Sequence, residues 1–271
     1  MRFCSTGITN AQPAADRRTE IAELVRRIGQ GEPVGQVLRH KRADVMVARA
    51  SLDQGSSVIV KLWDRRGVKQ LVRRWMGWSE PWREARALAR LNAVGMAAPG
   101  LLEQLRLNDP SVPYSHALII EDLGECVRAV EHVTDLVSRG LDDQLATVES
   151  EVIAITGDMV RAGVLDLDHS LNNMLIPPAG SARRVDLEFA VCCADANRRP
   201  RLYGTMLGRL IGTYTFAVQP GVERVFDFAD QLYRNVSPPA SVRRRAQQYV
   251  GQMMAGQRQS RGVDFEPELP G

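Results

Sequence analysis

Short runs of apolar residues, bounded by turn-forming residues, recur over much of the first half of the chain. Three short runs between residues 34 and 63 are rich in β-branched residues and are separated by turn-forming residues such as those at 53–55. The same pattern returns in 101–107 and 116–124. These segments predict five short strands.

Helical spacing of apolar residues marks the rest of the folded chain. It covers 19–29, returns in 82–95 after the third strand, and continues through 142–163. Two short apolar segments, 173–176 and 183–190, interrupt the helical second half and predict a small hairpin. We therefore expect an α+β protein, with a small antiparallel sheet first and a mostly helical part after it.

The organisation of the 271 residues follows from these patterns. The length suits two modest lobes, and we place an N-lobe at 19–123 and a C-lobe at 124–254. Residues 1–18 are rich in turn formers and residues 255–271 lack an apolar period, so both ends are predicted to be flexible.

Composition adds few constraints. With 44% hydrophobic and 25% charged residues, the chain resembles an ordinary globular protein, and its net charge of +3 gives no reason to expect nucleic acid as a partner. No apolar run approaches the roughly 20 residues that cross a bilayer, and the first residues lack the apolar core of a secretory signal, so we expect a cytoplasmic protein. The four cysteines lack CxxC spacing and indicate neither a disulfide framework nor a metal site.

Lysine is rare, which makes one lysine conspicuous. Lys occurs only at 41, 61 and 69, and Lys61 ends the apolar run Val58–Val60. Alternation places its side chain on the opposite face from Val60 and Leu62, and an inward lysine requires a carboxylate. Glu84, expected in the first turn of the next helix, is the candidate partner, although a surface lysine with its apolar stem packed down is the alternative.

Acidic and amide residues gather near the two short strands of the second half. Asp168 and Asn173 are five residues apart, and Asp186 follows Asp168 by eighteen. Oxygen ligands beside short strands are what a Mg²⁺ site facing phosphates uses. Each residue taken alone also fits a turn former or a helix cap.

Taken in order, these features resemble the protein-kinase-like fold over roughly residues 35 to 235. A strand lysine, a helix glutamate, an Asp-x-x-x-x-Asn loop and an Asp-hydrophobic-x metal motif follow one another. The segments VIVKLW, LIIEDLG and LDLDHSLNNMLI are most similar to the bacterial lipopolysaccharide core kinase family, which phosphorylates Kdo or heptose sugars. The resemblance implies a two-lobed kinase that uses ATP and Mg²⁺.

The resemblance also implies roles for individual residues. Lys61 would contact the α- and β-phosphates of ATP and be held by Glu84, while the backbone of Glu121 to Leu123 would meet the adenine edge.

In the second half, Asp168 would accept the proton of the attacking hydroxyl. Asn173 and Asp186 would hold Mg²⁺.

Three departures from the family pattern bear on activity. Asp166 stands where the family has His, and a carboxylate so near Asp168 would either disfavour ionisation of one of the two or attract a further cation. The phosphate-covering loop near 39–46 contains no Gly, and Glu188 stands where a protein kinase has Gly. A pseudokinase, or a nucleotide-binding scaffold without phosphotransfer, is therefore the main alternative.

The acceptor implied by the resemblance is an anionic sugar or glycolipid. Segment 187–202 has no Ser, Thr or Tyr, which disfavours a regulated protein kinase, and its arginines disfavour an aminoglycoside acceptor. Basic residues interleaved with Trp suit an anionic glycolipid or an anionic membrane surface and predict peripheral contact with the inner membrane. A solvated charged face with Trp packed inward is the alternative. The residues concerned are Arg65, Arg66, Lys69, Arg73, Arg74, Trp75, Trp78, Arg198, Arg199 and Arg201.

Overall fold

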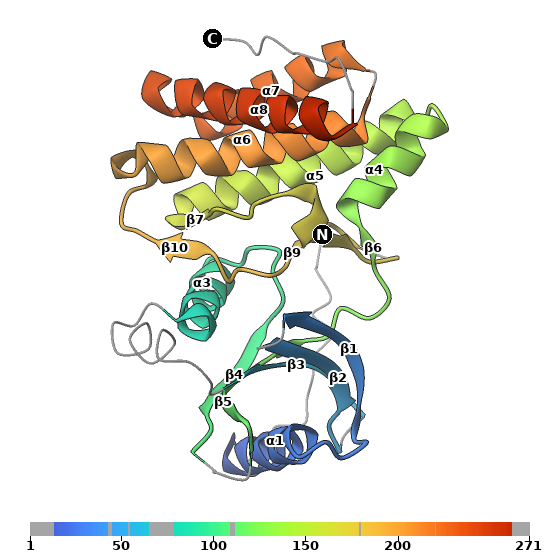
Figure 1. Cartoon of the computed structure of the whole chain (residues 1–271), viewed down its shortest axis with the longest axis vertical. Coiled ribbons are helices and arrows are strands. Elements are labelled where there is room, and N and C mark those ends of the chain that lie inside the picture. The colour runs from blue at the N-terminus through green and yellow to red at the C-terminus, as the bar shows by residue number, and fades with distance from the viewer. Residues whose placement is uncertain are drawn as a thin grey trace, which may run out of the picture. The chain divides into compact units, whose positions relative to one another are not determined.

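The computed structural model describes residues 14–42, 45–53, 55–64, 79–108, 112–178, 180–219 and 221–261. It forms two compact units, drawn in Figure 1. The sheet unit comes from Met1–Gly67 and Leu102–Asp122, and the helical unit from Val68–Leu101 and Leu123–Gly271. The segment 68–101, inside the predicted N-lobe, thus belongs to the helical unit, because its helix packs on short strands there.

The described residues of the sheet unit form one helix and five strands, in the sheet order β1-β2-β3-β5-β4. Neighbouring strands pair antiparallel from β1 to β2, β2 to β3 and β3 to β5. All five predicted strands and the first helix are confirmed, although the helix begins before Thr19. The elements are α1 (Ala14–Gly29), β1 (Gly35–Arg42), β2 (Val45–Ser51), β3 (Ser57–Asp64), β4 (Leu101–Arg106) and β5 (Tyr114–Glu121).

The core of the sheet unit forms between α1 and one face of the sheet, as Figure 1 shows. Apolar residues at helical spacing on α1, such as Ile21 and Val25, meet alternate residues of the strands, such as Ala48, Val60 and Leu62. These five side chains are all at most 2% exposed. One face of the sheet is therefore buried beneath α1, and the buried residues Val47, Lys61 and Leu118 show that β2, β3 and β5 are buried on both faces.

The helical unit contains six α-helices and five short strands in its described part. The helices are α3 (Glu80–Ala93), α4 (Ala129–Ser138), α5 (Asp142–Arg161), α6 (Pro200–Ala217), α7 (Val222–Val236) and α8 (Ala240–Arg261). The strands are β6 (Val127–Arg128), β7 (Val164–Asp166), β8 (Met174–Ile176), β9 (Arg183–Arg184) and β10 (Ala190–Cys192). Helix α8 thus runs into the segment 255–271 that was predicted to be a flexible tail.

The predicted hairpin is present as β8 and β9, but the second segment does not form one strand. Residues 183–190 divide into β9, which pairs with β8, and the start of β10, which pairs with β7. Asp186 lies between them with a φ of 63°, a left-handed conformation that ends the extended backbone.

Glycines let α6 and α8 approach closely. Gly204, Gly208 and Gly212 recur every four residues and so line one face of α6. A Cβ at Gly208 would lie 2.6 Å from the backbone oxygen of Ala246 on α8, and Cβ atoms at Gly204 and Gly212 would be equally crowded. This close packing places α8 side chains beside α6.

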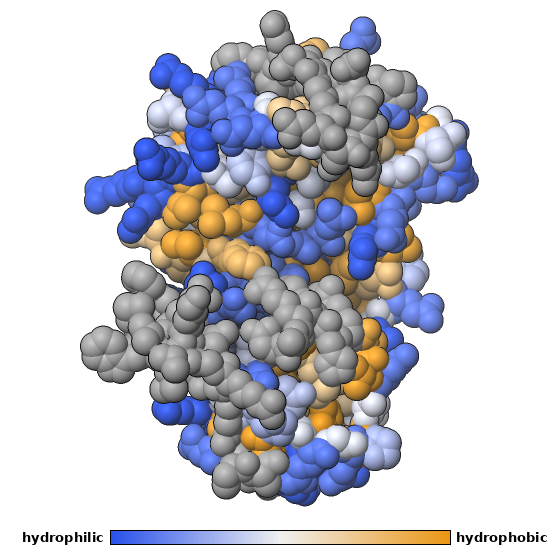
Figure 2. Space-filling view, in the orientation of Figure 1, coloured by the Kyte–Doolittle hydropathy of each residue, from blue (hydrophilic) through white to orange (hydrophobic). Residues whose placement is uncertain are grey.

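No helix within the described ranges has the length and apolar content to cross a bilayer. Figure 2 shows hydrophilic residues interrupting the hydrophobic surface of the helical unit on the face it draws. Within the described residues, the large apolar side chains that are exposed lie on three elements: Val37 and Leu38 on β1, Trp82 and the C-cap residue Val94 at α3, and Val127 on β6.

Candidate active site

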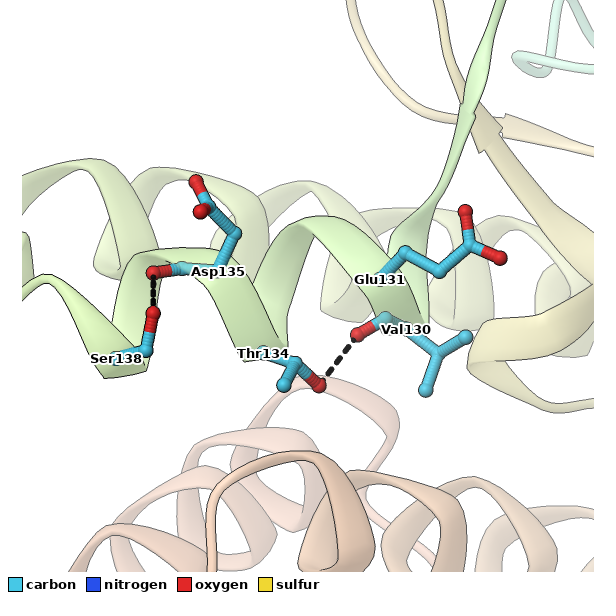
Figure 3. Close-up of a pocket in the computed structure, with 5 residues that line it drawn as sticks. All are labelled: Val130, Glu131, Thr134, Asp135 and Ser138. Atoms are coloured by element: carbon cyan, nitrogen blue, oxygen red, sulfur yellow. Dashed lines mark hydrogen bonds between the residues drawn. The ribbon is translucent and has the colours of Figure 1, made fainter.

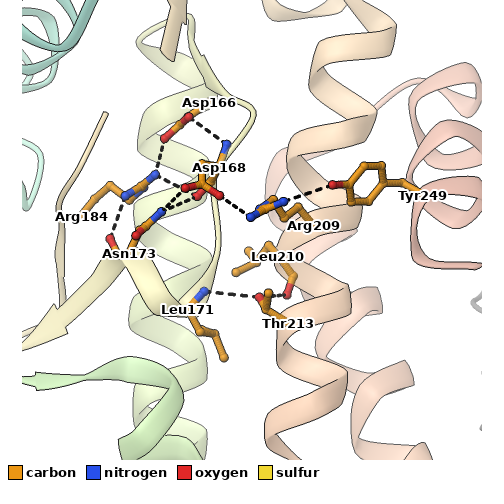
Figure 4. Close-up of polar contacts among 9 residues, drawn as sticks. All are labelled: Asp166, Asp168, Leu171, Asn173, Arg184, Arg209, Leu210, Thr213 and Tyr249. Atoms are coloured by element: carbon orange, nitrogen blue, oxygen red, sulfur yellow. Dashed lines mark hydrogen bonds and ion pairs between the residues drawn. The ribbon is translucent and has the colours of Figure 1, made fainter. Parts of the chain in front are cut away.

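Asp168 and Asn173 lie in the connection between β7 and β8, and the structure brings their side chains together. The amide nitrogen Nδ2 of Asn173 donates to the carboxylate oxygen Oδ2 of Asp168 at 2.8 Å and to the Asp168 carbonyl at 2.9 Å (Figure 4). These bonds leave the Asn173 oxygen Oδ1 as the atom that it offers to a cation. The Asp168 side chain is 28% exposed, so a substrate can reach it.

Asp166, at the end of β7, is not a second reactive carboxylate beside Asp168. It is fully buried, forms an ion pair with the equally buried Arg184, and accepts a hydrogen bond from the backbone nitrogen of Asp168 at 3.0 Å. Burial raises the pKa of the Asp166 carboxyl, and the Arg184 guanidinium opposes that rise. Both outcomes expected for this carboxylate are thus present: its ionisation is disfavoured by burial, and a cation, Arg184, pairs with it.

Arg184 extends this support to the rest of the loop. Its Nη1 donates to the Asn173 carbonyl at 2.8 Å, and its Nη2 also lies 3.3 Å from the Asp168 carbonyl. One buried guanidinium thus joins Asp166, Asp168 and Asn173. No pattern in the sequence singles out Arg184, for which the only signal is a basic residue two positions before Asp186.

Three carboxylates meet next to this loop. Glu84 of α3, Asp186 and Glu188 each place an oxygen within 4.8 Å of the other two. Glu84 and Glu188 are fully buried. The backbone nitrogen of Val185 donates to the Asn173 carbonyl at 3.0 Å, which holds Asn173 beside this cluster.

The donor set fits a hard divalent cation, because carboxylate and amide oxygens are the ligands that Mg²⁺ uses. Buried carboxylates so close together also require positive charge near them. The left-handed backbone of Asp186 is uncommon for a residue other than Gly and costs about 1–3 kcal/mol, a feature that concentrates at functional sites. Glu84 lies one turn further along α3 than predicted, since the helix already begins at Glu80.

Arg209 reaches Asp168 from α6. One guanidinium nitrogen, Nη2, forms an ion pair with the Asp168 oxygen Oδ1, and the other, Nη1, lies 3.3 Å from the hydroxyl of Tyr249 on α8 (Figure 4). The loop is also tied to α6 where the Leu171 nitrogen meets Thr213 Oγ1 at 3.4 Å. Neither Arg209 nor Tyr249 was found from the sequence.

The remaining predicted residues lie at the sheet. Lys61 lies on β3 opposite Val47 and Leu118, and only 5% of it is exposed, so the inward orientation is confirmed. Glu121 ends β5 and is exposed, and Leu123 is partly buried. Lys61 belongs to the sheet unit and Glu84 to the helical unit, and their pairing stays a prediction, as does the adenine contact.

Two arginine-rich segments were expected to face an acceptor. Arg198, Arg199 and Arg201 are exposed around the start of α6, and Arg198 lies 3.6 Å from Asp195. The basic and aromatic connection from Arg65 to Trp78 lies outside the described residues.

A surface pocket elsewhere in the helical unit has different chemistry. It follows α4 and is lined by Val130, Glu131, Thr134, Asp135 and Ser138 (Figure 3). Its hydroxyls bond to the backbone of the same helix, Thr134 to Val130 at 2.9 Å and Ser138 to Asp135 at 2.8 Å. The pocket includes none of the predicted site residues.

Comparison with known proteins identifies the fold. No protein-family model and no curated protein matches the chain. Among solved structures 1008 chains match, so the fold is widely used and does not by itself specify a substrate. One of them, WaaP in complex with acyl carrier protein, has a TM-score of 0.55 and 22% sequence identity, with 87% of this chain and 94% of that chain covered. The resemblance to the lipopolysaccharide core kinases is thereby confirmed at the level of the fold: the chain has the α+β, protein-kinase-like architecture that its motifs predicted.

Proposed function

We propose that the protein is an ATP-dependent kinase that transfers a phosphoryl group to a sugar hydroxyl of lipopolysaccharide core or of a related glycolipid. The observation that carries the proposal is the Asp168–Asn173 pair, joined by a 2.8 Å hydrogen bond and held beside the Glu84–Asp186–Glu188 cluster, on a kinase-like fold. A base next to a cation site is the arrangement that phosphoryl transfer requires.

Asp168 is the proposed general base. It accepts the proton of the attacking hydroxyl, and its bond from Asn173 holds the carboxylate in one orientation. Asn173 and Asp186 hold Mg²⁺, which neutralises charge on the phosphates. The two neighbouring carboxylates, Glu84 and Glu188, increase the negative charge that attracts the cation.

The nucleotide lies against the sheet unit in this proposal. Lys61 contacts the α- and β-phosphates and pairs with Glu84, whose place among three carboxylates favours a cationic partner. The backbone of Glu121 to Leu123 contacts adenine. The neighbouring Asp122 supports that segment, because its carboxylate forms an ion pair with Arg49 and accepts hydrogen bonds from Arg49 Nη2 at 3.2 Å and Ser57 Oγ at 2.6 Å.

The acceptor is proposed to be an anionic glycolipid at the cytoplasmic face of the inner membrane. Exposed arginines at 198, 199 and 201 favour such an acceptor, as does the arginine- and tryptophan-rich connection in the sequence. A cationic aminoglycoside would instead require an acidic acceptor surface.

A pseudokinase remains the second candidate, and the observation that favours it is the Gly-free segment 39–46. Its other support was Asp166 in place of His. That support is weakened, because Asp166 is neutralised by Arg184 and braces the loop through the Asp168 nitrogen.

Calorimetric titration with Mg·ATP, followed by a transfer assay, distinguishes the two. A kinase binds Mg·ATP and transfers phosphate to glycolipid from a strain lacking the gene, and mass spectrometry locates the added phosphate. Binding without transfer to any sugar acceptor would favour the scaffold. No binding and no thermal shift would refute the nucleotide-dependent function altogether.

A further inference from the structure

Two arginines approach Asp168, and they differ in how exposed their guanidinium groups are. Arg184 is fully buried and is engaged by Asp166 and by two backbone carbonyls. Arg209 is 35% exposed and meets the exposed carboxylate of Asp168. Arg209 is therefore the cation that an incoming substrate can reach.

The cation that meets Asp168 comes from a different element of the fold. The loop from Asp168 to Asn173 contains no Lys or Arg, and no Lys follows residue 69. Helix α6 supplies the charge instead, and the Tyr249 hydroxyl on α8 supports the guanidinium at 3.3 Å. The glycine-lined contact between α6 and α8 makes this support possible.

We propose that Arg209 is a catalytic residue whose guanidinium binds the oxygens of the phosphoryl group during transfer. The inference rests on the proposed kinase function and adds a residue to it. The acceptor oxygen bonds to the γ-phosphorus of ATP while the bond from that phosphorus to the β-bridging oxygen breaks. The hydroxyl proton moves to Asp168, and ADP leaves with the bridging oxygen.

The geometry suits this role. Negative charge spreads over the non-bridging oxygens during transfer, and a planar guanidinium can donate two hydrogen bonds to them. Arg209 lies beside the base, so the phosphoryl group that Asp168 serves comes within its reach. In the absence of substrate the same guanidinium is neutralised by Asp168, which explains how a partly buried charge is tolerated there.

The test is binding of a phosphoryl-transfer analogue. Aluminium fluoride with Mg·ADP mimics the group in transfer, and calorimetry measures how far it tightens Mg·ADP binding. In Arg209→Met and Arg209→Gln we expect Mg·ADP binding within about threefold of the parent and most of the tightening lost, with kcat lowered about 10²–10³-fold. Arg209→Lys keeps the positive charge but lacks the paired donors of a guanidinium. Its tightening and its kcat should therefore lie between those of the other two variants and those of the parent.

The matched control is Arg139→Met at the C-cap of α4, where an exposed arginine pairs with Asp135 and where we expect parent behaviour. Retained Mg·ADP binding shows that each Arg209 variant is folded. Parent-like tightening in Arg209→Met and Arg209→Gln overturns the inference, and if kcat falls all the same, Arg209 only positions Asp168. If the parent binds no Mg·ADP, the kinase function itself is refuted. If the parent and its Arg209 variants all bind Mg·ADP and transfer phosphate equally well, this inference alone is refuted.

Discussion

The carboxylate of Asp166 and the guanidinium of Arg184 form an ion pair inside the helical unit, and neither side chain is exposed to solvent. The pair joins the loop that carries Asp168 to the strand that precedes Asp186. Because Arg184 also bonds to the Asn173 carbonyl, the relative positions of Asp168, Asn173 and Asp186 depend on it.

Arg184→Met should destabilise the protein by about 3–5 kcal/mol, because it leaves a buried carboxylate without its guanidinium. Urea unfolding measures the change. Arg139→Met is the control, since its pair with Asp135 is more than half exposed on both sides and should contribute at most about 1 kcal/mol. Equal losses in the two variants would show that Arg184 does not brace the loop.

Asp168→Asn should lower kcat about 10²–10⁴-fold and leave ATP binding intact, because the amide cannot accept the proton but can still accept the Asn173 hydrogen bond. Single-turnover transfer and calorimetry give the two quantities. A variant with the parental rate would remove Asp168 from its proposed role.

Asp186→Ala should weaken nucleotide binding in the presence of Mg²⁺ far more than in its absence, because it removes a carboxylate ligand of the cation. Titrations with ATP, with and without Mg²⁺, provide the comparison. The same loss of affinity under both conditions would argue that Asp186 does not act through the metal.

Gly208→Ala should cost about 1–3 kcal/mol, because the new methyl group would lie 2.6 Å from the Ala246 carbonyl oxygen and α8 must move to admit it. Gly251→Ala is the matched control on α8. No atom lies within 4 Å of its Cβ position, so this change should stabilise the helix by about 0.5–1 kcal/mol. Chemical denaturation compares the two, and a stabilised Gly208→Ala would contradict the close α6–α8 contact.

Acid should destabilise the protein through His169. Burial, together with the Arg184 charge, lowers the His169 pKa well below 6.5, and its Nε2 lies 2.9 Å from Thr156 Oγ1. The unfolded chain therefore binds a proton below pH about 6.5 that the folded chain does not, and stability falls as the pH is lowered from there. Between pH 7.5 and 5.5, the free energy of unfolding of His169→Gln, measured with urea, should fall by about 1.4 kcal/mol less than that of the parent. Equal losses would exclude this contribution.

Elements that depend on local pattern were accessible from the sequence. Alternation around Lys61 and helical spacing in 142–163 report which face of a strand or helix is buried, and the structure confirms both elements. The spacing of Asp168 and Asn173 likewise predicted a pair that the fold brings into hydrogen-bond contact. The single strand predicted over 183–190 was wrong, because the left-handed backbone of Asp186 divides it, and no composition signal marks that conformation.

The sequence by itself determined the element order, the two-part α+β architecture and the residue types of the proposed site, because periodicity and short spacings are properties of neighbouring residues. Only the tertiary structure decided that Arg184 neutralises Asp166 and that Arg209, with Tyr249 behind it, meets Asp168. These contacts join residues on different helices and strands. Their positions follow from how α6 and α8 pack through glycines, and long-range packing of this kind leaves no periodic trace in a single chain.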